Sequence, residues 1–293
     1  YQRNLAVTAF VAPNIVIRRS LDSIEATIAK DFLRSASQVH AQLTDPRPLY
    51  ATLAVGADAL HDRIELQNFL QEITELDDPP TGFYLLVEHP DTVIPPTLEE
   101  PGVLSRWMLI NRVLSLSGYE VINGYSDVLG PYLGAAGASM VATGWFNTLK
   151  MFSLNKFGPN SGFARQPVPR YASARLLKSI RHTELEALRD TFPEVLNGHA
   201  TDQDYDREEG SRPSSAGEAL QNWACIRQLS ELVVAGNPVE SMANISVAVN
   251  QAEETYAGIG ALGITLRARS NKEHLACIRE ELQAFGSLAE IQT

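Results

Sequence analysis

Hydrophobic positions in the first half of the chain form short continuous runs that alternate with stretches of helical spacing. The continuous runs lie at 49–55, 83–88, 119–125 and 138–143. An earlier β-branched run, 5–17, is broken by Pro13-Asn14. Stretches with apolar residues at helical spacing lie at 20–43, 57–76 and 98–117. Continuous runs are typical of strands that are buried on both faces, so the pattern predicts about five strand–helix units and an α/β fold.

These units fit two architectures. They fit the later part of a (β/α)₈ barrel, a TIM barrel that is N-terminally incomplete, because a whole barrel takes about 250 residues. They also fit an open, doubly wound sheet. Neither a G-x-G-x-x-G motif nor a P-loop motif follows any of the strands. We therefore expect a barrel-like domain.

The pattern changes near Phe157, where an irregular segment rich in Gly and Pro begins. Helical spacing resumes at 173–197, 216–234, 239–256 and 272–288. We expect three parts: a barrel-like domain at 1–156, a basic linker at 157–171 and an all-helical C-terminal domain at 172–293.

Charge is distributed unevenly along this acidic chain. The formal net charge is −11, yet the segment 128–183 contains no Asp or Glu. It carries Lys150, Lys156, Arg165, Arg170, Arg175, Lys178 and Arg181. A concentrated basic segment indicates an anionic partner, either a small molecule or nucleic acid. The alternative is that these cations pair with the acidic remainder of the protein.

Composition narrows the class of protein. No apolar run reaches the length of about 20 residues that spans a membrane. The two cysteines, Cys225 and Cys277, cannot form a framework of several disulfides. We expect a soluble, cytoplasmic protein without a membrane partner, with a helical domain available to a protein partner.

The first candidate site follows the run at 83–88. Glu88 and His89 emerge there from a buried strand, and Asp91 comes two residues later. Desolvation of a carboxylate suits general acid or base chemistry, and His89 suits proton transfer or orientation. One histidine with two carboxylates does not predict a metal site. The alternative is that these side chains only cap the loop.

The second candidate site follows the run at 119–125. Asn123 and Tyr125 are expected to contact substrate, and Asp127 is expected to face Glu88 as a partner carboxylate. Paired carboxylates suit cleavage of a glycosidic bond. The alternative for Asp127 is a helix N-cap.

The third candidate site follows the run at 138–143. Thr143, Gly144 and Trp145 open the next segment, and Lys150 follows them. Backbone N–H groups and a hydroxyl at such a position bind phosphate in many barrels. The alternative is close packing that requires a glycine.

The basic linker supplies the last candidates. Arg165 and Arg170 are interleaved with aromatic residues, and a linker that folds over the barrel would bring them onto an anion. The sequence thus predicts an enzyme that acts on a phosphorylated, nucleotide-like or nucleic-acid-like substrate: a hydrolase, a lyase, or a transferase of a base or glycosyl group. The alternative is a non-catalytic subunit that binds nucleic acid or a protein through 150–181. The sequence does not specify a cofactor.

Overall fold

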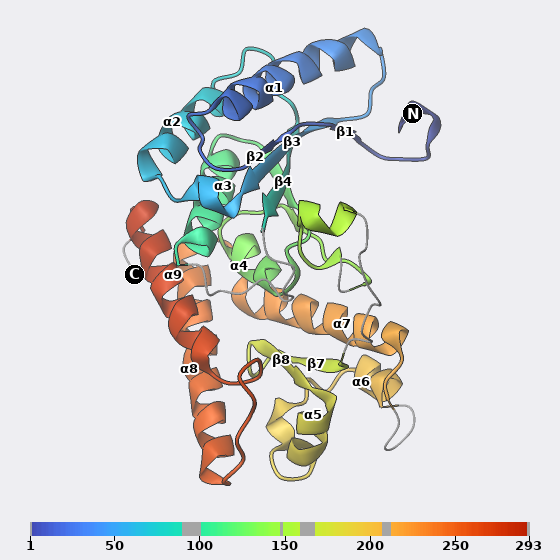
Figure 1. The fold of residues 1–293 in the computed structure, drawn as a ribbon, viewed down its shortest axis with the longest axis vertical. Coiled ribbons are helices and arrows are strands. Elements are labelled where there is room, and N and C mark those ends of the chain that lie inside the picture. The colour runs from blue at the N-terminus through green and yellow to red at the C-terminus, as the bar shows by residue number, and fades with distance from the viewer. Residues whose placement is uncertain (1, 90–100, 147–148, 159–167, 207–211, 292–293) are drawn as a thin grey trace.

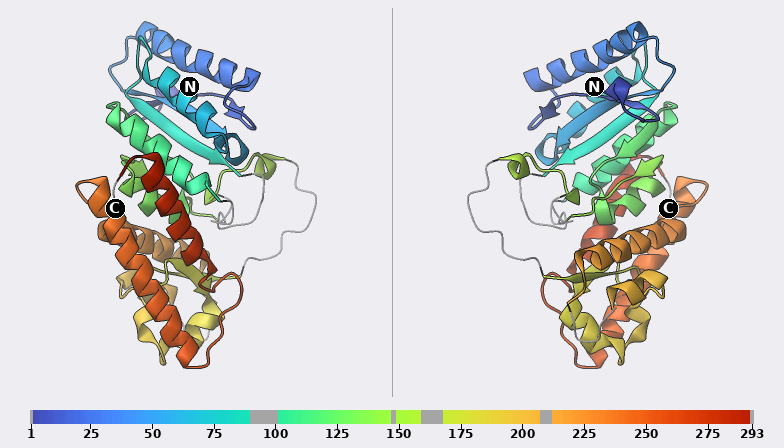
Figure 2. Two further views of the ribbon diagram at one scale, coloured as in Figure 1. Left: turned by 90° about the vertical axis from the view of Figure 1, so that its left-hand side faces the viewer. Right: turned by 90° about the vertical axis from the view of Figure 1, so that its right-hand side faces the viewer.

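We describe a computed structural model of the chain, in which residues 2–89, 101–146, 149–158, 168–206 and 212–291 are placed. Figures 1 and 2 show an elongated molecule. The parallel sheet and helices α1 and α2 form one end, and a small hairpin with α5 and α6 forms the other.

The main sheet is entirely parallel. Its strands are β1 (Phe10–Ala12), β2 (Val16–Ile17), β3 (Leu49–Gly56), β4 (Gly82–Glu88), β5 (Glu120–Asn123) and β6 (Met140–Val141). The order is β1-β3-β4-β5-β6, and β2 also pairs with β3. Pro13-Asn14 separates β1 from β2, and the Asn14 amide donates to Thr52 O at 2.9 Å across the gap. The predicted α/β class, and the interruption in the first strand, are therefore confirmed.

The sheet is open. Strands follow one another in chain order, as they do in a barrel, but no pairing joins β1 to β6 in the described part of the chain. The expected barrel is therefore not closed. The two outer strands are also short, which limits how far the sheet curls.

Three helices cover one face of the sheet. They are α1 (Ile24–Gln42), α2 (Arg63–Thr74) and α3 (Val103–Leu116). The side chains of Ser23 and Asp62 cap the first two, as expected from their hydrogen-bonding oxygens. Buried residues of these helices share one hydrophobic cluster with the strand residues Leu53, Leu85 and Val121.

On the opposite face of the sheet, residues of the segment 149–158 pack near the ends of β3 and β4. Phe152 packs there against Ala54 and Leu86, with Tyr84 and Leu154 at the margin. This segment belongs to the basic stretch of the sequence, so the stretch lies across the sheet where β3 and β4 end.

The C-terminal part is helical but not entirely so. Its helices are α5 (His182–Arg189), α6 (Ala200–Tyr205), α7 (Ser215–Val233), α8 (Pro238–Ala261) and α9 (Glu273–Leu288). The strands β7 (Arg170–Ser173) and β8 (Lys178–Arg181) form an antiparallel hairpin where the sequence pattern predicted the start of a helix. That prediction was wrong because Leu177 adopts a left-handed backbone, φ 53°, which turns the chain back.

The two parts of the chain share their core. Helix α7 packs on α4 (Gly130–Ala135) and α9 packs on α3, and one hydrophobic cluster extends from the sheet to α9. Short 3-10 helices occupy Gln2–Asn4, Ala57–Leu60, Asp127–Leu129, Leu154–Phe157 and Pro193–Val195. The division at 156 and 171 stays a prediction.

Among the described residues, every helix is too short or too polar to cross a membrane.

Candidate functional site

The carboxyl end of β4 is extended by a segment from the basic stretch. Glu88 forms a parallel bridge with Phe152, and His89 N donates to Phe152 O at 3.0 Å. One carboxylate oxygen of Glu88 also accepts from Leu154 N at 3.3 Å. The segment therefore occupies the place beside β4 that β5 leaves after Asn123.

Two buried polar side chains without a hydrogen-bond partner follow this bridge. Residues 89 and 153 each come one position after the bridged pair 88 and 152, and a continued parallel register would place them on the same face. His89 is 8% exposed, and Ser153 is fully buried. Neither His89 Nε2 nor Ser153 Oγ has a hydrogen-bond partner in the described structure. Most buried polar atoms of folded proteins have a hydrogen-bond partner, so both atoms require an explanation.

The environment of His89 keeps its imidazole neutral. Burial is the main cause that lowers its pKa to about 4, and the nearby Lys156 ammonium adds to the effect. The ring lies against Trp107, with 6.5 Å between ring centroids. A neutral buried imidazole can still accept a proton or a hydrogen bond at Nε2.

Asp127 lies in a separate cluster. Its Oδ1 accepts from Thr143 Oγ1 at 2.7 Å and from Asn222 Nδ2, on α7, at 3.0 Å. No hydrogen bond joins Asp127 to Glu88 among the described residues, and the two carboxylates contact different elements. The pairing of these two carboxylates across the site stays a prediction.

The loop after β5 has a strained backbone. Tyr125 and Asp127 have φ values of 58° and 40°, in the left-handed region that favours glycine. Such outliers are often found at functional sites. The Tyr125 ring packs on Phe152, with 5.6 Å between centroids, so this loop and the segment beside β4 support each other.

The Asn123 side chain forms hydrogen bonds within the protein core. Its Oδ1 accepts from Trp107 Nε1 at 2.7 Å and from Asn111 Nδ2 at 3.2 Å, and its Nδ2 donates to Asn111 Oδ1 at 2.7 Å. The fully buried amide therefore makes three hydrogen bonds, one with Trp107 and two with Asn111, and it orients Trp107 beside His89. Its predicted contact with substrate stays a prediction.

The predicted phosphate loop shows close packing. A side chain at Gly144 would overlap Leu149, and the Thr143 hydroxyl already donates to Asp127. Trp145 lies partly exposed, edge-on to Trp223, with 5.3 Å between centroids. The packing alternative therefore accounts for Gly144, and nothing in this loop tests the phosphate prediction.

The predicted cations differ in their surroundings. Lys150 is buried, and its charge opposes the burial that raises the pKa of Glu218. Arg170 donates to Ser179 O, Arg269 O and Ser270 Oγ, which joins the hairpin to the segment before α9. Arg165 lies outside the described residues. The hydrogen bonds of Arg170 go to carbonyl and hydroxyl oxygens of the protein, and whether these cations serve an anionic ligand or the acidic remainder of the protein stays open.

Sequence reasoning missed several residues of the site. These are Trp107, Ser153 and Asn222, while Lys156 was named only as part of the basic segment. The one available signal was on α7, where Glu218, Asn222 and Cys225 follow helical spacing as a polar stripe on a buried face.

Within the described part of the chain, no group of three or more His, Cys, Asp or Glu side chains is arranged to hold a metal ion. Comparison of the chain with known protein families, with curated proteins and with solved structures found no match.

Proposed function

We propose that this protein is an enzyme whose chemistry takes place at the carboxyl edge of the sheet, with His89 as the proton-transferring residue. The observation that carries the proposal is the buried Nε2 atom of His89, which has no hydrogen-bond partner in the described structure, together with the equally buried and unpartnered hydroxyl of Ser153 in the segment that is bridged to β4. Strongly shifted pKa values and unsatisfied polar atoms concentrate at catalytic sites. The carboxyl edge is also where parallel α/β sheets bind their ligands.

An anionic substrate suits this edge. The Lys156 ammonium lies close enough to lower the pKa of His89, and its Nζ also donates to Met151 O at 2.9 Å. In this proposal the same ammonium attracts an anion to the site. A bound anion would stabilise the imidazolium and raise the pKa of His89 toward neutrality, where proton transfer is most effective. We therefore retain a phosphorylated or nucleotide-like substrate and a hydrolytic, lyase or transfer reaction.

The two carboxylates take different roles in this proposal. Glu88 holds the segment 152–154 against β4 and so positions His89 and Ser153. Asp127 holds Thr143 and α7 behind the site. Both are positioning residues in the free protein, and Ser153 is the hydroxyl that can contact substrate.

We also infer that the sheet is related to the later part of a (β/α)₈ barrel. The support is the sequential strand order and the position of α1, α2 and α3 on one face of the sheet. A doubly wound sheet would place its helices on both faces.

A binding subunit is the alternative, and it has less support. Arg170 and Arg175 both use their guanidinium groups inside the protein, Arg175 through Thr255 and Gln251 of α8. Cations engaged in this way are not available to track a nucleic-acid backbone.

The test is a screen of nucleotides, nucleosides and sugar phosphates for turnover, with His89→Gln as the variant. His274→Gln is the matched control, because His274 is also 8% exposed and burial also lowers its pKa to about 4. The nitrogens of His274 face Asn271 O and Leu176 O, so it has partners where His89 has none. We expect His89→Gln to lose at least about a hundredfold in kcat and His274→Gln to retain it. Equal losses in the two variants, with both folded, would overturn the proposal.

A further inference from the structure

Helix α1 carries its large apolar side chains on its exposed side. The side facing the sheet buries Ala26, Ala29 and Leu33. The outer side presents four large residues, which we call the α1 stripe: Ile24 (81% exposed), Ile28 (42%), Phe32 (44%) and Val39 (55%). Their spacing places them on one face of the helix. A helix with small residues inside and large apolar residues outside is built to pack on two sides.

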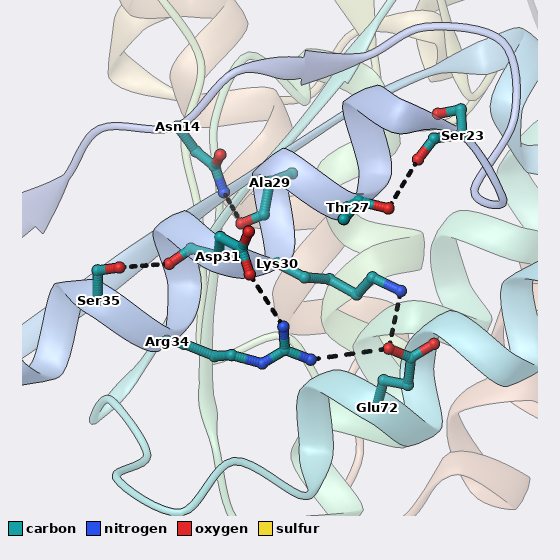
Figure 3. A network of polar contacts seen from close by, with 9 residues as sticks. All are labelled: Asn14, Ser23, Thr27, Ala29, Lys30, Asp31, Arg34, Ser35 and Glu72. Atoms are coloured by element: carbon teal, nitrogen blue, oxygen red, sulfur yellow. Dashed lines mark hydrogen bonds and ion pairs between the residues drawn. The ribbon is translucent and has the colours of Figure 1, made fainter.

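The polar side of α1 faces α2. Lys30 binds Glu72 of α2 at 2.7 Å, and Arg34 lies 3.9 Å from the same carboxylate. Figure 3 shows both cations reaching from α1 to α2. The α1 stripe is therefore a third side, and its four residues are 42% to 81% exposed.

A groove adjoins the stripe. A cavity of about 600 Å³ lies between α1 and β1, and Phe32 and Val39 of the stripe form part of its wall with Phe10, Ala12 and Leu43. Its lining contains no acidic residue, although the protein as a whole is strongly acidic.

The neighbouring edge of the sheet is closed to another strand. Gln2 donates through Nε2 to Val11 O at 2.8 Å, and its Oε1 accepts from Val11 N at 2.9 Å. The Gln2 carboxamide therefore satisfies the backbone N–H and C=O of Val11, which would otherwise pair with a neighbouring strand. Pro13 follows directly and has no N–H to offer. An added strand would gain little here, so the α1 stripe is the part of this face left to cover.

We propose that the α1 stripe is the interface with a second copy of this chain, in a two-fold symmetric dimer. The stripe is self-complementary about Phe32, with Ile24 and Ile28 on one side and Val39 on the other, so two antiparallel α1 helices cover each other. Phe32 of each copy lies next to the groove of the other. Helix α1 has two acidic and two basic residues and no net charge, so two copies of a protein with charge −11 can meet here without strong repulsion.

The test is the molecular mass in solution, measured by sedimentation velocity over a wide range of protein concentration. Wild type is expected at twice the chain mass of 32.1 kDa. Val39→Glu is expected to raise the dimer dissociation constant by at least about a hundredfold, because it buries a charge in an apolar contact. Val247→Glu on α8 is the matched control, since Val247 is 53% exposed and Val39 is 55% exposed.

Each outcome decides the proposal. A dimer that Val39→Glu dissociates and Val247→Glu preserves supports it. A wild-type monomer at every concentration overturns it, and the stripe is then covered by another polypeptide. A dimer that both variants preserve also overturns it, because the contact then lies elsewhere. If Val39→Glu does not fold, hydrogen exchange of wild type at two protein concentrations takes its place. Slower exchange of α1 in the concentrated sample supports the dimer, and equal exchange at both concentrations overturns the proposal.

Discussion

Glu88 and Phe152, 64 positions apart in the chain, are partners in a parallel bridge at the carboxyl end of β4. This pairing comes one position before His89 and Ser153. It also buries both side chains at the edge of a parallel sheet, where ligands are usually bound. The candidate chemistry therefore depends on a contact between a strand and a segment of the basic stretch.

Stability should fall in mild acid because two histidines are held neutral. Burial lowers the pKa of His89 and of His274 from 6.5 to about 4. Between these values the unfolded chain takes up protons that the folded chain does not, so the free energy of unfolding decreases as pH falls. Each histidine should contribute about 1.4 kcal/mol per pH unit in this window, and nothing above it. Urea unfolding at pH 7, 6 and 5 measures the slope.

A matched variant separates this effect from other acid-sensitive groups. His274→Gln does not titrate, so its unfolding free energy should depend less steeply on pH than that of wild type. An unchanged slope in His274→Gln and in His89→Gln would show that neither histidine is kept neutral by the fold.

Asp127 should be more important as an acceptor than as a charge. Asp127→Ala leaves the buried donors of Thr143 and Asn222 without their acceptor, and we expect a loss of about 2–4 kcal/mol. Asp127→Asn keeps an oxygen in place and tolerates the left-handed backbone, so it should lose less. Thermal unfolding compares the two, and equal destabilisation would contradict this account.

The Glu281 carboxylate should stabilise the packing of α9 on α3. Its carboxylate accepts from the backbone N–H groups of Gly102 and Ser105 at the N-terminus of α3. We expect Glu281→Gln to cost about 1–2 kcal/mol, because the bonds lose the charge that strengthens them at a helix N-terminus. The neighbouring Glu280 is exposed, so Glu280→Gln is the control. A similar effect of both variants on chemical denaturation would speak against this role.

Position 124 should require glycine because the Tyr84 hydroxyl leaves no room for a side chain there. A side chain at 124 would overlap the Tyr84 hydroxyl, so Gly124→Ala should destabilise the protein by about 1–3 kcal/mol. Tyr84→Phe removes the hydroxyl and should recover part of the loss, because Leu86 remains in the way. A double-mutant cycle measures the coupling between the two positions, and additive effects would rule out the proposed overlap.

Much of the fold could be predicted from local patterns. The continuous apolar run at 83–88 corresponds to β4, and the helical spacing at 272–288 corresponds to α9. A buried strand and a buried helix face each require apolar residues at characteristic positions in the sequence. The hairpin at 170–181 could not be predicted in this way. Its strand β7 is fixed by Gln221 of α7, whose amide bonds both Ala172 N and Ala172 O from 49 residues away.

The candidate site was predictable only in part. Glu88, His89 and Asp127 were identified because polar residues that follow buried strands collect at one edge of a parallel sheet. Their partners were not identifiable, since Ser153 and Asn222 reach the site through contacts between distant segments. Local patterns also gave no sign that Asn123 pairs with Asn111.

The most direct test of the central claim is the titration of His89, followed by NMR of its imidazole in the absence and presence of adenosine monophosphate and inorganic phosphate. The account predicts a pKa near 4 in the free protein, an upward shift when either anion binds, and no shift for His274. A His89 that titrates at its ordinary value, or one that responds to neither anion, would contradict the claim that His89 is the proton-transferring residue of an anion-binding site.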